Sequence, residues 1–391
     1  MRRCSGAAML AACVSVTASA NAEGLEPYQM IRSLQLVQDR IADGDHAALP
    51  IQRRLLAIID ERLHTADFEN PHNFRALLIY GASGGNPATL DAVISRLKLD
   101  EDQSRLSNGL TQYARGDLRA AREMLSATEL STLDPELAAP LALVIGSLLA
   151  QQAPTEALRF FDQARLISPG TLIEEAALRR SLTLSAELRD PERFALASRQ
   201  YAWRFLRSPY ASQFAEAFVS GVVALRGEID LAVVEEIVAN MRRDQAHVIY
   251  LRIARQSAIE GYDNLLTFAS RNADKYADSG GGLDPRSVLY GNMALVASED
   301  VKDVLHTLEQ IDAKRLSPND HKLLNAAREV ARKILSRPAA GSEASARQSS
   351  LPEGEAVVAQ ESEDEQLNGA FVADTLKTLQ SIDVLIAEAR R

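Results

Sequence analysis

Residues 106–128 read LSNGLTQYARGDLRAAREMLSAT, and residues 141–169 read LALVIGSLLAQQAPTEALRFFDQARLISP. In both stretches apolar residues recur at spacings of three and four, the period of an amphipathic α-helix. Gly116-Asp117 is a turn signal between two such patterns. Each stretch therefore predicts two helices joined as a hairpin. The residues in corresponding places on the second helices are Ala121 and Leu125 in one hairpin, and Ala157 and Phe161 in the next.

A third hairpin follows, with Ala197 and Tyr201 in those places, and it ends at Ser208-Pro209. Pro135, Pro169 and Pro209 are separated by 34 and then 40 residues. The first spacing is the tetratricopeptide period, although most large aromatic positions of that motif are absent. A single hairpin cannot bury both of its faces, so neighbouring hairpins must stack. The sequence predicts an all-α fold, a right-handed solenoid of antiparallel, degenerate tetratricopeptide-like hairpins with a concave binding surface.

The same periodicity extends over residues 23–335, which form the predicted helical body. Residues 27–42 carry an apolar stripe and predict the first helix. Proline at the first helical position, preceded by Asn or Asp, marks a helix start, because the side-chain oxygen accepts a free N–H and proline has none. About sixteen helices of 11 to 19 residues fit between such signals. The five pairs are Asn70-Pro71, Asn86-Pro87, Asp134-Pro135, Asp190-Pro191 and Asp284-Pro285.

The N-terminal residues 1–22 resemble a secretory signal peptide. Arg2 and Arg3 precede an apolar stretch that ends in small residues up to Ala22, which predicts cleavage and export to the periplasm. The stretch is too short for a membrane span, and a buried first helix is the alternative. Both cysteines, Cys4 and Cys13, lie inside it, so the cleaved chain would have no thiol. Cys13 also fits a lipoprotein processing site, which would leave a lipid anchor.

The C-terminal part changes composition. Residues 336–366 are rich in Pro, Gly, Ser, Ala, Glu and Gln, and predict a disordered acidic linker. Residues 367–391 carry a stripe of Val, Leu and Ile and predict an amphipathic helix. This helix either docks onto the solenoid as a cap or contacts a partner.

Composition and motifs argue against several functions. A net charge of −10 disfavours nucleic-acid binding, which needs a basic surface. The six histidines form no zinc-ligand pattern, and His64 and His72 indicate a surface pair. Residues 81–85, GASGG, are glycine-rich like a phosphate-binding loop, but the Gly-Lys-Ser/Thr that such a loop needs does not follow. They therefore predict an ordinary loop between helices. The adjacent glutamates at 174–175 and 235–236 are typical of solvated helix surfaces. We therefore expect no catalytic residue, no metal and no cofactor.

The segment most suggestive of a contact surface is residues 199–207. It contains the only tryptophan, Trp203, with Arg199 and Arg207 at helical spacing on either side. Trp and Arg are enriched among residues that dominate binding energy. These three residues are therefore candidate partner-binding residues. The alternative is that Trp203 packs beside Leu196 and Leu206 in a groove between helices.

The start of the helical body resembles the MotC family, periplasmic motility proteins of flagellated alphaproteobacteria. The resemblance implies a non-enzymatic periplasmic protein that flagellar rotation requires and that acts with the periplasmic part of the stator protein MotB. It implies no catalytic or binding positions. The residues that resemble the family are Glu26-Pro27-Tyr28, Ile31-Arg32-Ser33-Leu34-Gln35, Val37-Gln38-Asp39, Gly44-Asp45-His46-Ala47-Ala48 and Gln52-Arg53.

Two other functions remain open. A helical-repeat scaffold for cell-envelope assembly, periplasmic or lipid-anchored, would have the same architecture. An enzyme resembling the helical part of a lytic transglycosylase would need a lysozyme-like domain with a catalytic glutamate, which no segment supplies. Without such chemistry the predicted protein acts by binding a protein partner.

Overall fold

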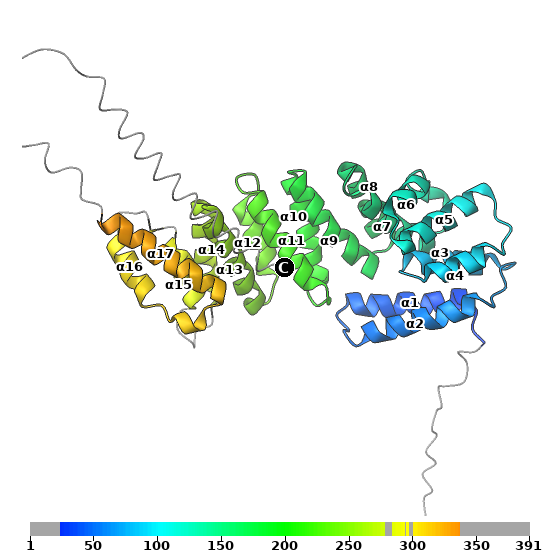
Figure 1. Cartoon of the computed structure of the whole chain (residues 1–391), viewed down its shortest axis with the longest axis horizontal. Coiled ribbons are helices and arrows are strands. Elements are labelled where there is room, and N and C mark those ends of the chain that lie inside the picture. Colours follow the sequence, from blue (N-terminus) through cyan, green and yellow to red (C-terminus); the bar gives the residue numbers. More distant parts are fainter. Residues whose placement is uncertain (1–23, 278–283, 294, 297–299, 337–391) are drawn as a thin grey trace, which may run out of the picture. The chain divides into compact units, whose positions relative to one another are not determined.

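The computed structural model describes residues 24–277, 284–293, 295–296 and 300–336 (Figure 1). The predicted signal peptide, the predicted linker 336–366 except for its first residue, and the predicted C-terminal helix lie outside these residues. The described residues form helices and no β-strand, so the all-α prediction is confirmed.

Seventeen α-helices and two short 3-10 helices occur in the described part of the chain. In the first half they are α1 (Pro27–Ala42), α2 (Ala48–Leu63), α3 (Pro71–Ala82), α4 (Pro87–Ile94), α5 (Glu101–Arg115), α6 (Leu118–Leu125), η1 (Leu130–Thr132), α7 (Pro135–Leu149), α8 (Pro154–Ile167) and α9 (Leu172–Glu187). In the second half they are α10 (Pro191–Arg204), α11 (Ala211–Ala224), α12 (Leu231–Ala239), α13 (Arg243–Glu260), α14 (Asp263–Tyr276), α15 (Pro285–Met293), α16 (Val301–Glu309), η2 (Ala313–Arg315) and α17 (Pro318–Ser336).

All five predicted Asn-Pro and Asp-Pro helix starts are confirmed. In each pair the side-chain oxygen accepts a backbone N–H from the first turn, as Asn70 does from His72 at 3.0 Å. The predicted lengths are partly wrong, because α4 and α6 have only 8 residues and α12, α15 and α16 have 9. The predicted loop 81–85 is also shorter than expected, since Gly81 and Ala82 complete the last turn of α3.

Most helices pack against elements one or two positions away in the chain. Examples are α5 with α6, α7 with α8, α8 with α9, and α13 with α14 and α15. This order of contacts is compatible with the predicted stack of hairpins. Two contacts depart from it, α3 with α7 and α1 with α9. The N-terminal hairpin α1–α2 therefore also packs against the middle of the described chain.

Helix α9 is shared between the two large apolar clusters of the described residues. One cluster is built from α1 to α9 and includes Ala177 and Leu184 of α9. The other extends to α17 and includes Leu178 and Leu182 of the same helix. Successive residues of α9 thus face different neighbours. Because α9 is buried on several sides, its polar side chains also lie inside the protein.

Glycines let neighbouring helices approach closely. A Cβ added at Gly146 of α7 would lie 2.6 Å from the Phe161 ring of α8, closer than side chains tolerate. The absence of a side chain at Gly146 is therefore what makes room for the aromatic ring. The same arrangement recurs between Gly109 of α5 and Leu125 of α6, and between Gly221 of α11 and Phe194 of α10.

The third hairpin has a different register from the predicted one. Counted from the residue that caps each helix, Ala121 of α6 and Ala157 of α8 both occupy the fourth place. In α10 that place belongs to Phe194, which packs against a glycine of α11. Ala197 and Tyr201 are buried as expected but lie three residues farther along, so their predicted alignment is wrong. A large side chain fits at this place because the adjoining helix supplies the space.

The start of α15 is fixed by an ionic cap. Asp284 accepts the backbone N–H of Arg286 at 2.8 Å, a side-chain hydrogen bond from Arg286 at 2.7 Å, and one from His247 of α13 at 3.2 Å. Burial raises the pKa of Asp284, but the hydrogen bonds from Arg286 and His247 outweigh it and hold the pKa at about 2. The carboxylate thus links α13 to α15.

We predict that Gly146→Ala lowers the free energy of unfolding by about 1–3 kcal/mol, because the new methyl group collides with Phe161. The matched control is Gly291→Ala in α15, where the nearest atom to an added Cβ is 3.8 Å away. That change should be neutral or stabilise the helix by about 0.5–1 kcal/mol. Urea denaturation measures both variants, and equal effects would contradict the packing role of Gly146.

We also predict a pH-dependent contribution from Asp284. Its folded pKa of about 2 lies below the ordinary value of 3.8, so its stabilisation is present above pH 3.8 and is lost as the pH falls through about 2. Asp284→Asn keeps a capping oxygen but removes the charge. Its unfolding free energy should lie below that of the wild type near neutral pH and approach it near pH 2. A difference that stays constant over this range would contradict the role of the charge.

Candidate interaction surface

Trp203 lies on the solvent side of α10 and is 84% exposed, the highest value among large apolar side chains of the described residues. Tryptophan is usually well buried, since its ring removes a large apolar area from water. The alternative prediction, that Trp203 packs in a groove beside Leu196 and Leu206, is wrong: Leu196 is itself 47% exposed. The aromatic neighbours Tyr201 and Phe205 are buried, as expected. Trp203 is thus available to a partner.

Arg199 lies one turn before Trp203 and is hydrogen-bonded to α12. Its guanidinium donates two hydrogen bonds to Glu236 of α12, at 2.9 and 2.8 Å. Hydrogen bonds from Arg199 lower the pKa of Glu236. Both side chains are solvent-accessible, so the pair adds little stability but orients the arginine. Glu235 pairs similarly with Lys275 of α14, so these glutamates lie at the surface, as predicted.

Arg207 follows α10, in a loop held by the N-terminal hairpin. The Nε2 of His46 donates to the backbone carbonyl of Arg207 at 3.2 Å. Gly44 has a φ of +100°, which favours glycine, and it lies against this loop. A Cβ added to Gly44 would be only 2.7 Å from the Cβ of Arg207. Gly44 and His46 belong to the segment that resembles the MotC family. The α1–α2 turn therefore positions the loop, while the Arg207 side chain stays exposed.

Behind Trp203, α9 holds two buried carboxylates. Glu175 is fully buried and Glu174 is 5% exposed, so the prediction of a solvated pair is wrong. Glu175 accepts hydrogen bonds from the Tyr201 hydroxyl at 2.7 Å and from Arg179 at 3.1 Å. Glu174 forms an ion pair with Arg204 at 2.7 Å. Buried charges persist only when they are paired, so these contacts fix the C-terminal half of α10 against α9.

Burial, and then the charge of Glu175, raise the pKa of Tyr201. Its hydroxyl therefore stays protonated and donates to the carboxylate at any physiological pH. The tyrosine ring also stacks on Phe214 of α11, with centroids 4.1 Å apart. Trp203 is thus presented by a helix whose buried side is rigidly packed.

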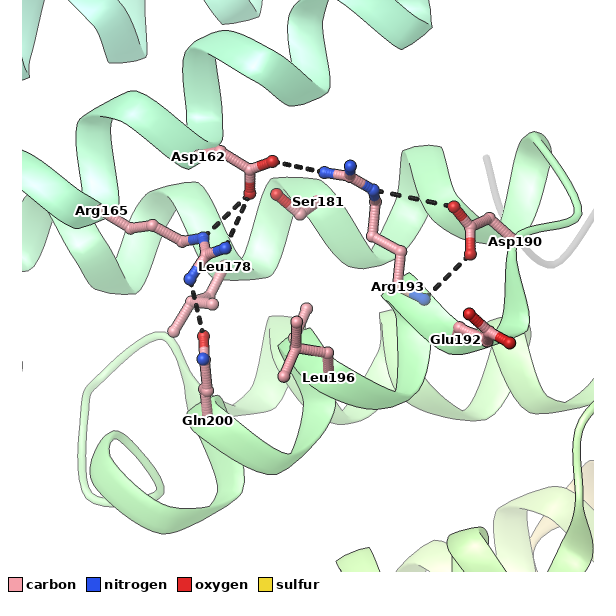
Figure 2. A pocket seen from close by; sticks show the side chains of 10 residues that line it. Asp162, Arg165, Leu178, Ser181, Asp190, Glu192, Arg193, Leu196 and Gln200 are labelled. Carbon is pink, nitrogen blue, oxygen red and sulfur yellow. Dashed lines mark hydrogen bonds and ion pairs between the residues drawn. The ribbon is translucent and has the colours of Figure 1, made fainter.

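A polar cavity of about 290 Å³ lies beside the same helix (Figure 2). Asp162 of α8 bridges two arginines, Arg165 of its own helix at 2.9 Å and Arg193 of α10 at 2.5 Å. Arg165 also donates to Gln200 at 3.2 Å, and Leu196 stands at the rim (Figure 2). These contacts join α8 to α10 and leave a depression next to the exposed leucine.

Two further apolar side chains of this region, Leu196 and Leu166, are exposed and were not predicted to be so. Leu166 of α8 is 69% exposed. It lies twelve residues after the first proline of its helix, as Trp203 does in α10, so the two are in equivalent positions. This equal spacing can be read from the sequence. It could have predicted that the two side chains are exposed on the same side of their hairpins.

Within the parts that the structure describes, no three His, Cys, Asp or Glu side chains gather in a way that could hold a metal ion. His64 lies near Thr89, whereas His72 contacts Arg75, so the two histidines have separate neighbours. None of the described helices combines the length and apolar character of a membrane span.

Comparison with known proteins gives one consistent result. The family model described as "Chemotaxis protein MotC" matches residues 1–391. A curated protein, chemotaxis protein MotC of Rhizobium meliloti (strain 1021), is 42% identical over 328 residues, which are 83% of this chain and 76% of the relative. No solved structure gives a significant match.

We predict that Trp203→Ala leaves the melting temperature almost unchanged, because an 84% exposed ring loses little contact. Phe205→Ala, two residues away, removes a side chain that is 1% exposed and should cost about 3–5 kcal/mol. Thermal unfolding followed by circular dichroism compares the two. A large loss of stability in Trp203→Ala would show that the ring packs against the protein.

Proposed function

The chain belongs to the MotC family of chemotaxis proteins, and on that premise we propose that it is a non-enzymatic periplasmic motility protein required for flagellar rotation. It acts as a helical scaffold that binds the periplasmic part of the stator protein MotB. Family membership supports the role in motility. Export rests on the signal-like residues 1–22, and the partner rests on the family resemblance.

The exposure of Trp203 is the observation that supports binding most directly. A monomeric protein gains nothing from leaving its only tryptophan in water, whereas a partner can bury most of the ring. Arg199 and Arg207 flank it and supply hydrogen-bond donors at the rim. We name Leu196, Arg199, Trp203 and Arg207 the α10 surface.

The α10 surface suits a preformed interface. Arg199 is oriented by Glu236, and the buried Glu174 and Glu175 fix α10 from behind. A surface that is already ordered loses little side-chain entropy when it binds, which favours affinity. Binding therefore requires no rearrangement of the hairpins, and no chemical step is needed for the proposed role.

We predict that Trp203→Ala weakens binding to the purified periplasmic domain of MotB by at least about tenfold, the loss expected for a buried aromatic anchor. Isothermal titration with the full chain measures the affinity. Trp203 is the only tryptophan of this chain, so the tryptophan emission that the chain adds to the mixture comes from this surface, and burial by MotB should shift that emission to shorter wavelength.

Leu118→Ala is the matched control, because Leu118 is also an exposed apolar side chain, 55% exposed, but lies on α6. It should bind MotB as the wild type does. A strain that carries Trp203→Ala in place of the native gene should swim poorly, and the Leu118→Ala strain should swim normally. Wild-type affinity and an unshifted Trp203 emission would overturn the proposed surface, and normal swimming of a deletion strain would overturn the proposed function.

A further inference from the structure

A groove lies where α1 packs across α7 and α9. Two hollows of about 240 Å³ each lie beside α1 and share Gln35, Gln38, Leu172 and Ile173 in their walls. One hollow reaches α3, and the other reaches the start of α7. The first is lined mainly by apolar side chains, namely Ile79, Ala82, Pro140, Leu143, Leu172, Ile173 and Ala176.

Two amide side chains of α1 face this groove without a partner. Gln35 and Gln38 are half-buried, one turn apart, and neither makes a hydrogen bond within the described residues. Both amides are accessible to water, since neither is among the buried polar groups that lack a partner in the described residues, and a ligand can therefore reach them. Each amide can donate to a carbonyl and accept from an N–H, which is the pattern that an extended backbone requires. An extended peptide would satisfy both.

One end of the groove holds a half-buried carboxylate, Asp39, close to Glu136. Glu136 is paired with Arg32 at 3.6 Å and with Arg75 at 3.9 Å, so it adds no free negative charge. Burial raises the pKa of Asp39, and the negative charge of Asp43 raises it further. The hydrogen bond from the backbone N–H of Leu172 lowers the pKa and offsets part of this increase. Among the described residues, no lysine or arginine forms an ion pair with Asp39. A half-buried carboxylate without a cation is complementary to a positively charged side chain from outside.

The opposite wall is rigid. Glu175 and Arg179 line the groove and are paired with each other, and Arg179 also stacks over Tyr210 with its guanidinium 5.2 Å from the ring centroid. These charges are satisfied and do not compete for a ligand. The groove is therefore preformed, with an apolar middle, free amides along one side and one uncompensated carboxylate at one end.

We propose that this groove binds an extended peptide segment of a protein partner, with aliphatic side chains in the apolar hollow and a lysine or arginine at Asp39. Gln35 and Gln38 hydrogen-bond the peptide backbone. The groove is separate from the α10 surface and gives the protein a second, charge-selective contact. It does not depend on the identity of the partner that binds Trp203.

The test uses the full chain and two labelled pentapeptides, N-acetylated and C-amidated. One is valine-lysine-valine-threonine-valine, and the other has glutamate in place of lysine. Fluorescence anisotropy should show the lysine peptide binding about tenfold more tightly, the difference expected for one charge-assisted contact. Asp39→Asn should abolish this preference while keeping an oxygen for the Leu172 N–H. The double variant Gln35→Ala, Gln38→Ala should weaken both peptides.

Ser83→Phe, which fills the hollow at the end of α3, is a second way to block the groove and should abolish binding of both peptides. Gln163→Ala on exposed α8 and Trp203→Ala should bind the peptides like the wild type. Equal affinity for the two peptides, no binding of either, or undiminished binding by the Ser83→Phe variant would each overturn the proposal. Loss of MotB binding by Trp203→Ala alone would leave it untouched, so the two proposals fail separately.

Discussion

The hydrogen bond between the buried carboxylate of Glu175 and the hydroxyl of Tyr201 is a buried polar contact between α9 and α10. A fully buried charge must be compensated, and Arg179 and Tyr201 do so here. The bond fixes α10 on α9, and α9 contributes to both apolar clusters. Helix α9 therefore both supports the α10 surface and forms one wall of the peptide groove. The positions of the two surfaces depend on how α9 is packed.

Around this helix the fold follows from close packing of small against large side chains. Gly146 accommodates Phe161, and Gly221 accommodates Phe194, although these pairs lie in different orders along the chain. A large residue can thus occupy different places in successive hairpins, provided that a neighbouring helix leaves space. This explains why the repeat is recognisable but degenerate, and why the register of the third hairpin differs from its predecessors.

The N-terminal hairpin adds the long-range order that stacked hairpins usually lack. Its turn, with Gly44 and His46, touches the loop of Arg207, and its first helix closes the groove against α7 and α9. The segment that resembles the MotC family most clearly is therefore the one that joins distant parts of the described chain. A scaffold that binds through preformed surfaces benefits from such a junction, because it keeps exposed side chains such as Trp203 in fixed positions.

Most helices and their proline-linked caps could be predicted from the sequence, because helical period and capping depend on residues within about four positions of one another. Asn70 and Asp190 show this. The exposure of Trp203 and the burial of Glu175 depend instead on tertiary packing, since neighbouring helices determine which side of α10 and of α9 is covered. The groove at Gln35 could not be predicted from the sequence either, because its walls come from α1, α3, α7 and α9, which meet only in the folded protein.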